Sequence, residues 1–216
     1  MARGPLLSAD MGLDHSLVGR GPRGLTEFCA DLGNLQVALP VLALAILYVL
    51  RRGRRVPSAP LDVPRGAVAH LRRRRGWSRG SPRPHGALPL ATALAMAAVP
   101  AVVVPLKALI DRPSPLDPAE TGYFPSGHGA TAAVAYCGAA LLLRAGAGGR
   151  WPAAVAFVLT ATTGIGLVLR GYHWPLDVLG SWCLSVLLLA PAWWLSRRAA
   201  AGSPPRASRA PGAPGR

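Results

Sequence analysis

Three short polar segments of the sequence carry side chains that can bind and transfer a phosphoryl group. They are Lys107–Pro115, Pro125–His128 and Arg170–Asp177, and each adjoins an apolar stretch. Together they contain cations, a hydroxyl, a glycine and two histidines. Such groups can bind a tetrahedral anion, attack it and release the product. The residue types therefore predict a phosphate site if the three segments converge.

The middle segment is placed to begin a helix. Ser126 and Gly127 precede the apolar run Gly129–Leu143, with Ser126 at the position of a helix N-cap, so the next backbone N–H groups point outward. Phosphate binds readily at such a helix start. The alternative is a capped loop in which His128 has no chemical role, because short Ser-Gly caps are common.

The third segment pairs an imidazole with a carboxylate. His173 and Asp177 are four residues apart, so they share a face if a helix begins near Trp174. The carboxylate can then hold one imidazole nitrogen and leave the other free to attack phosphorus. Alternatively, Trp174 anchors the chain at the membrane interface and His173 has no catalytic role. A carboxylate just inside an apolar segment is costly, which favours a function for Asp177.

The elements that position these segments are predicted to lie in lipid. Hydrophobic residues make up 51% of the 216 residues and charged residues 15%, a composition that favours a membrane protein. Windows of about 20 residues, the length that spans hydrocarbon, locate five apolar stretches. These are Leu35–Leu50, Ala87–Leu106, Ala130–Leu143, Pro152–Leu169 and Trp174–Leu195. We therefore predict an all-α, polytopic transmembrane helix bundle with five spans.

Basic residues are distributed unevenly between the two ends of these spans. Of the 24 Lys and Arg residues, 18 fall in the alternate connections at 51–83, 144–150 and 197–216. The positive-inside rule makes that side cytoplasmic. The other side holds the three polar segments and eight of the nine acidic residues. We expect the N-terminus and the site outside, the C-terminus inside, and the protein in a bacterial-type cytoplasmic membrane.

The basic residues of the polar segments have two interpretations. Lys107, Arg112 and Arg170 can bind a phosphate, or they can extend toward lipid headgroups by snorkelling. The second interpretation is weaker on the outer leaflet, because basic residues there run against the positive-inside bias.

The remaining segments are predicted to be connections and tails. Residues 1–33 lack the apolar core of a signal peptide and are expected to form a mobile extracytoplasmic segment. The transmembrane domain, 34–198, contains an Arg-rich cytoplasmic loop at 51–86 without helical periodicity. The tail at 199–216 consists of Ala, Pro, Gly, Ser and Arg and is predicted to be disordered and cytoplasmic.

Composition also argues against two other classes of site. The net charge of +15 comes from basic residues that lie mostly between and after apolar spans, and no nucleic-acid-binding motif accompanies them, so we expect no nucleic-acid partner. The three cysteines, Cys29, Cys137 and Cys183, indicate neither a disulfide framework nor a cysteine-based metal site.

Taken together, the three segments resemble the signature of the type 2 phosphatidic acid phosphatase superfamily, in its bacterial membrane-bound branch. That signature has Lys followed at a distance by Arg-Pro, then Pro-Ser-Gly-His, and then Arg, His and Asp before an apolar helix. Pro125–His128 matches the middle motif outright, and His173–Val178 is similar to the end of the third. The resemblance covers Lys107–Trp194, and the order of the motifs matches too.

The resemblance implies a role for each matching residue. His173 would be the nucleophile that forms a phosphohistidine, Asp177 would orient it, and His128 would protonate the leaving oxygen. The phosphoryl oxygens would be held by Lys107, Ser126 and Gly127. The family needs no metal or other cofactor, and its substrate here would be a phospholipid or polyprenyl phosphate in the membrane.

Two arginines stand at positions that differ from the family signature. In the first motif the expected position is Ser114, and Arg112 comes two residues earlier. In the third motif the expected position is Leu167, and Arg170 comes three residues later, close to the same helical face. We expect Arg112 and Arg170 to bind phosphate from these shifted positions. The family also usually has six spans, whereas five are predicted here.

The sequence thus predicts a hydrolase of lipid phosphomonoesters or diphosphates. The alternative is a non-catalytic or degenerate membrane protein that uses the same cations to bind or move anionic lipid. His173 and Asp177 discriminate between the two, because an anion-binding protein needs cations but no oriented nucleophile.

Overall fold

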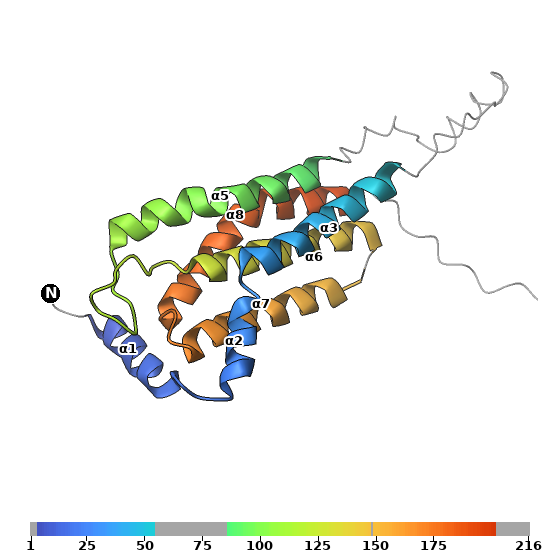
Figure 1. Cartoon of the computed structure of the whole chain (residues 1–216). Helices are drawn as coiled ribbons and strands as arrows, with labels where there is room; N and C mark the ends of the chain where they lie inside the picture. The colour runs from blue at the N-terminus through green and yellow to red at the C-terminus, as the bar shows by residue number, and fades with distance from the viewer. Residues whose placement is uncertain (1–3, 55–85, 148, 202–216) are drawn as a thin grey trace, which may run out of the picture.

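The computed structural model describes residues 4–54, 86–147 and 149–201, and all regular secondary structure in these ranges is helical (Figure 1). The helices are α1 (Pro5–Leu17), α2 (Arg23–Asp31), α3 (Leu35–Arg54), α5 (Ala87–Ile110), α6 (Gly127–Ala147), α7 (Trp151–Leu169) and α8 (Pro175–Ala201). The prediction of an all-α fold is confirmed. The predicted loop at 51–86 and tail at 199–216 fall mostly outside the described residues.

Four of the described helices, α3, α5, α7 and α8, are long and apolar enough to cross a membrane. They contain four of the five predicted spans, and the remaining one, Ala130–Leu143, lies within α6. α6 has 21 residues, enough to cross about 30 Å of hydrocarbon at about 1.5 Å per residue. The count of five spans stays a prediction.

The centre of the bundle is α6, which contacts α3, α5, α7 and α8 (Figure 1). Its buried side chains are mostly small, and Ala130, Ala132 and Ala135 are fully buried. Small side chains let helix backbones approach closely, which stabilises packing in lipid. Large apolar side chains such as Leu94 and Val186 are instead exposed on the outside of the bundle. This distribution suits a surface surrounded by hydrocarbon.

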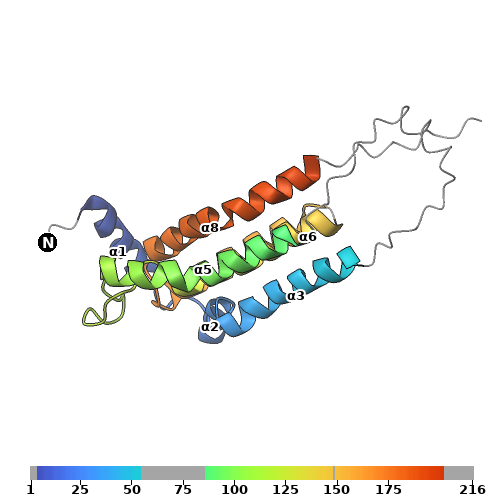
Figure 2. The same cartoon turned by 90° about the horizontal axis from the view of Figure 1, so that it is seen from above.

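The three polar segments lie at one end of the bundle, because the long helices alternate in direction (Figures 1 and 2). α5 ends there at Ile110, where Asp111 is left-handed (φ 47°) and its N–H donates to the Lys107 carbonyl. Pro113 follows two residues later, and proline disfavours a helical conformation at the residue before it. α6 and α8 begin at the same end, whereas α3 and α8 finish at the opposite one, as the predicted sidedness requires.

The N-terminal segment, expected to be mobile, forms α1 and α2 at the end of the bundle that holds the polar segments (Figure 1). α2 packs closely on α7 at Gly166, where an added Cβ would lie 2.5 Å from the Ala30 nitrogen. The buried residues of α1 are Asp10 and Asp14. The sequence carries no clear signal for either helix, because neither is long enough to span a membrane and α1 buries carboxylates instead of an apolar stripe.

Candidate active site

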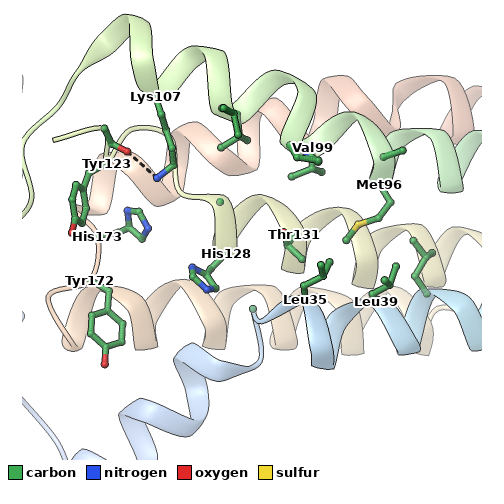
Figure 3. A pocket seen from close by; sticks show the side chains of 18 of the residues that line it. Leu35, Leu39, Met96, Val99, Lys107, Tyr123, His128, Thr131, Tyr172 and His173 are labelled. Carbon is green, nitrogen blue, oxygen red and sulfur yellow. Dashed lines mark hydrogen bonds between the residues drawn. The ribbon is translucent and has the colours of Figure 1, made fainter. Parts of the chain in front are cut away.

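A cavity of about 1200 Å³ extends from the end of the bundle that holds the polar segments along the space between α3 and α5 (Figure 3). Its polar end is lined by Lys107, Tyr123, His128 and His173. The rest is lined mainly by apolar side chains, among them Leu35, Leu39, Met96, Val99 and Val103. The cavity therefore offers a polar site continuous with a long apolar groove.

The start of α6 forms one wall of the polar end. The Ser126 hydroxyl accepts a hydrogen bond from the Gly129 N–H at 3.1 Å, as an N-cap does. Ser126 is fully buried, and its own N–H donates to the Asp177 carbonyl at 3.1 Å. Gly127 and His128 line the cavity. The predicted cap is thus present, and it joins the second motif to the third.

His128 is held against the turn that joins α2 and α3. An added Cβ on Gly33 would lie 3.1 Å from the His128 Cβ and 2.8 Å from the Thr163 methyl, so this turn fits only a glycine without displacement. Figure 3 shows the His128 imidazole and the His173 imidazole pointing into the same end of the cavity. The two predicted catalytic imidazoles therefore come together from α6 and the α7–α8 turn.

His173 and Asp177 form the predicted pair. The His173 Nδ1 lies 3.4 Å from the Asp177 Oδ2, and this carboxylate oxygen also accepts the Trp174 N–H at 3.1 Å. Asp177 is fully buried and His173 is nearly so. The Tyr123 ring lies against the His173 ring, with centroids 5.6 Å apart. When Nδ1 carries the proton, Nε2 keeps a lone pair for attack on phosphorus.

Lys107 supplies positive charge to the polar end. Its Nζ donates to the Gly122 carbonyl at 2.8 Å, as the dashed line in Figure 3 shows, and lies 5.8 Å from the centre of the Tyr123 ring. Among the described residues that line the cavity, it is the one lysine or arginine. The anion-binding capacity of the cavity wall therefore rests on Lys107 and on the N–H groups that begin α6.

Arg112 makes its contacts behind the His173–Asp177 pair. Its Nη1 lies 2.6 Å from the Asp177 Oδ1, and its Nη2 pairs with the Asp10 Oδ2. The guanidinium also lies over the Trp174 ring, 5.3 Å from the ring centre. Ser114, at the family's arginine position, does line the cavity. The predicted role of Arg112 as a phosphate ligand stays a prediction, and in this arrangement both terminal nitrogens face carboxylates.

Arg170 lies near the surface beside α2. Its Nε is 2.6 Å from the Glu27 Oε2, and its guanidinium lies 5.5 Å from the Tyr172 ring centre. The Tyr172 hydroxyl donates to the other Glu27 oxygen at 2.7 Å. That hydrogen bond and the Arg170 charge lower the pKa of Glu27. Leu167, the family's arginine position, is buried in an apolar cluster. Arg170 as a phosphate ligand also stays a prediction.

Three further residues, Asp10, Glu120 and Tyr123, lie beside the site, although their positions in the sequence do not indicate this. Glu120 and Tyr123 line the cavity, and the Tyr123 hydroxyl donates to Glu120 at 2.6 Å. Asp10 contacts Arg112 and the start of α8. The available signal was the pair of carboxylates at positions 10 and 14, one helical turn apart in an otherwise weakly polar segment.

The described residues contain no group of three or more His, Cys, Asp or Glu side chains that could hold a metal ion.

The second carboxylate of α1, Asp14, provides a test of how this end of the protein is packed. Burial raises the pKa of Asp14 to about 6, and the nearby Asp10 and Asp177 charges add to the shift, which the His15 charge opposes. The folded protein then holds a proton that the unfolded chain releases near pH 4, so stability should fall as the pH rises from about 4 to about 6.

The loss above pH 6 should be roughly 2 to 3 kcal/mol. Asp14→Asn should remove this dependence, raising the unfolding midpoint in detergent at pH 7 and leaving it near the parent value at pH 4. Parallel pH profiles for the two proteins would contradict the buried, protonated state.

Comparison with known proteins identifies the family. A model of the PAP2 superfamily matches residues 88–200, more than half of the 216-residue chain. The chain belongs to the PAP2 superfamily. Its structure is also similar to that of the first transmembrane PAP2 type phosphatidylglycerolphosphate phosphatase from Bacillus subtilis, with a TM-score of 0.64 and 20% sequence identity. The similarity covers 91% of this chain and 87% of that chain. No curated protein matches the chain.

Membership of the PAP2 superfamily confirms the resemblance inferred from the three motifs, and with it a place in a family of phosphatases. The shared fold confirms a multi-pass transmembrane helix bundle. The roles of individual residues, the number of spans and the face of the membrane on which the site opens stay predictions for this PAP2 protein.

Proposed function

We propose that this PAP2 protein is a membrane phosphatase that hydrolyses the phosphate of a lipid through a phosphohistidine on His173. The observation that carries the proposal is that His173, His128 and Lys107 line one end of a cavity whose remaining length is an apolar groove. A lipid phosphate has the same division into a charged head and an apolar chain. The His173–Asp177 pair supplies the oriented nucleophile that lipid binding alone does not need.

The reaction proceeds in two steps. The Nε2 of His173 attacks phosphorus while the bond from phosphorus to the lipid oxygen breaks, and His128 donates a proton to that oxygen. A water molecule then attacks the phosphohistidine, gives a proton to His128, and releases inorganic phosphate with the free His173. Asp177 keeps the proton of His173 on Nδ1 throughout and balances the positive charge that develops on the imidazole.

The phosphoryl oxygens are assigned to Lys107 and to the backbone N–H groups at Gly127 and the first turn of α6. Ser126 sets the direction of these N–H groups by capping the helix. A lysine and a helix N-terminus both favour an anion and strengthen as negative charge grows on the transferring group. Arg112 and Arg170 would each have to leave a carboxylate partner to join this set.

The substrate class follows from the groove and from the similar protein. Leu39, Met96 and Val99 line a groove that suits an acyl or prenyl chain. The similar Bacillus subtilis protein is described as a phosphatidylglycerolphosphate phosphatase, which supports a phospholipid monophosphate. A polyprenyl diphosphate has the same amphiphilic form. The distribution of basic residues supports a site on the outer face of the cytoplasmic membrane.

Phosphate release from a panel of lipids tests the proposed function. Purified protein in detergent should release phosphate from at least one of phosphatidylglycerol phosphate, phosphatidate and an undecaprenyl diphosphate. It should act on that lipid in preference to glycerol 3-phosphate, which lacks the apolar chain. Absence of hydrolysis across the panel would contradict the proposal.

A mutation in the groove tests how the chain of the lipid is bound. Leu39→Trp should lower kcat/KM for the preferred lipid about tenfold, equivalent to losing the burial of about two methylene groups. Hydrolysis of the short ester p-nitrophenyl phosphate should stay within about twofold of the parent rate. The matched control is Leu44→Trp, on the same helix at an exposed position that does not line the cavity. Equal losses on both esters would indicate that the apolar chain of the lipid does not bind in this groove.

A second candidate function is binding of an anionic lipid without hydrolysis. It is favoured by one observation: Arg112 and Arg170 pair with carboxylates and do not line the cavity, which leaves fewer cations to stabilise a phosphoryl transition state than the family signature has. A protein of this kind would bind lipid phosphate in the same detergent samples and release no inorganic phosphate. The His173→Ala variant would then bind as tightly as the parent.

A further inference from the structure

We propose that Asp10 and Arg112 are positioning residues that hold Asp177 against His173, so that the N-terminal helix α1 is part of the catalytic assembly. The inference rests on the proposed function for the role of His173. It assigns Arg112 to the carboxylate network behind the nucleophile, and it gives a function to a helix that precedes all the long helices of the bundle.

One guanidinium, that of Arg112, bridges two carboxylates. Arg112 contacts the Asp177 Oδ1 at 2.6 Å through Nη1 and the Asp10 Oδ2 through Nη2. The side chains of Arg112, Asp10 and Asp177 are 11%, 2% and 0% exposed, so water does not compete strongly for these contacts. A planar guanidinium has donors at fixed angles, and two carboxylates on its terminal nitrogens therefore fix each other's positions.

The remaining oxygens of the two carboxylates also have hydrogen-bond partners. The Asp10 Oδ1 accepts the Leu176 N–H at 2.9 Å, in the first turn of α8, where helix N–H groups lack partners within the helix. The Asp177 Oδ2 accepts the Trp174 N–H and faces His173. Every oxygen of both carboxylates thus has a partner, and neither carboxylate can rotate without breaking a buried contact.

This network presents a net negative charge to His173. Two carboxylates and one guanidinium sum to one negative charge. Without Asp10, Arg112 would neutralise Asp177, and the imidazole would lose the counter-charge that it needs while phosphorus is transferred. Asp10 thereby preserves the negative character of Asp177. Lys107 and Asp14 also lie close enough to interact with Asp177 electrostatically, and they carry opposite charges when both are ionised.

The position of Arg112 in the sequence agrees with this role. It stands two residues before the family's arginine position, and that position, Ser114, lines the cavity where Arg112 does not. The Trp174 ring lies beside the guanidinium at 5.3 Å and donates its indole N–H to the Pro113 carbonyl at 2.9 Å. This hydrogen bond joins the loop after α5 to the α7–α8 turn. In this arrangement Arg112 points toward Asp10 and Asp177.

Substitution of Asp10 tests the inference kinetically. Asp10→Asn keeps an oxygen for the Leu176 N–H and loses the charge, so kcat for the preferred lipid should fall about tenfold or more while KM stays within about twofold. Asp10→Glu keeps the charge and should retain more of the parental kcat than Asp10→Asn does. Combining Asp10→Asn with Arg112→Gln should cost no more than Arg112→Gln alone, because the two residues act as one unit.

The matched control is Asp14→Asn, the same change one turn further along α1 at a buried carboxylate that forms no ion pair with Arg112. Assayed together with Asp10→Asn at about pH 5, where Asp14 is already mostly protonated, it should keep kcat within about twofold of the parent. A parental kcat for Asp10→Asn would overturn the inference. Equal losses for the Asp10 and Asp14 variants would also overturn it, because they would indicate general loosening of α1.

A second measurement separates this inference from the proposed function. ¹⁵N spectra of histidine-labelled protein in detergent micelles report the tautomer and environment of each of the five histidines, and His173→Gln identifies the His173 signals. Asp10→Asn should move those signals in the same direction as Asp177→Asn does. That result with an inactive parent would support the network and reject the phosphatase. Unchanged His173 signals would overturn the network even if the parent hydrolyses lipid phosphate.

Discussion

Replacing His173 with alanine should lower turnover of the preferred lipid phosphate by about 10⁴-fold or more. The expected loss is large because the reaction needs a bond between phosphorus and the Nε2 of an imidazole whose other nitrogen is held. His173 has that geometry, with its Nδ1 3.4 Å from a fully buried Asp177. Without the imidazole no covalent intermediate forms, so protein exposed to a radiolabelled phosphate ester and quenched without acid should retain no label.

The control for this experiment is His15→Ala, the same substitution at an exposed position of α1. It should keep both turnover and label. A His173→Ala protein that hydrolyses lipid phosphate at the parent rate, after removal of contaminating phosphatases, would exclude the phosphohistidine mechanism. Hydrolysis by this PAP2 protein would then have to use another nucleophile, such as water.

Replacing His128 with alanine should lower turnover of a lipid monophosphate by roughly 10² to 10⁴-fold, the usual contribution of a positioned acid or base. The lipid alkoxide leaves poorly unless it receives a proton. p-Nitrophenolate needs little protonation, so the initial burst of nitrophenolate from p-nitrophenyl phosphate should be reduced much less. Because His128 also activates the water of the second step, label on His173 should accumulate with this activated ester.

Rapid-quench kinetics with the two esters checks this prediction. The variants are expected to differ in kind, since His173→Ala leaves no label and His128→Ala leaves more of it. Equal slowing of the first step for both esters would indicate that His128 binds the phosphoryl group and does not protonate the leaving oxygen. The contact between Gly33 and His128 provides a further comparison, because Gly33→Ala should displace the imidazole without removing it.

The positions of the long helices followed from the sequence because their signal is local. An apolar run of about 20 residues has few alternatives to a membrane span, and α3, α5, α7 and α8 contain four of the predicted runs. The Ser126 cap and the His173–Asp177 pair were also predictable. Each depends on a spacing of three or four residues at the start of one helix, and the backbone geometry of that helix decides which side chains share a face.

The contacts of Arg112 and Arg170 could not be predicted from such local spacing. Arg170 was placed near the face of Leu167 as if the helix continued, but α7 ends at Leu169, and the Arg170 side chain lies beside Glu27 of α2. Arg112 lies in a proline-rich loop with no period to guide a prediction, and its partners are Asp10 and Asp177. Neither choice of partner can be read from neighbouring residues.

By itself the sequence determined the apolar helices, the identity of the three motifs and the separation of basic from acidic ends, since each depends on residue type or short spacing. Only the tertiary structure decided that α1 and α2 fold onto the site and that Asp10 meets Arg112. Those contacts join residues about a hundred positions apart in the chain. A buried charge pairs with the partner that the packing of the helices brings within reach, and hydrophobic periodicity does not indicate which residues will pair.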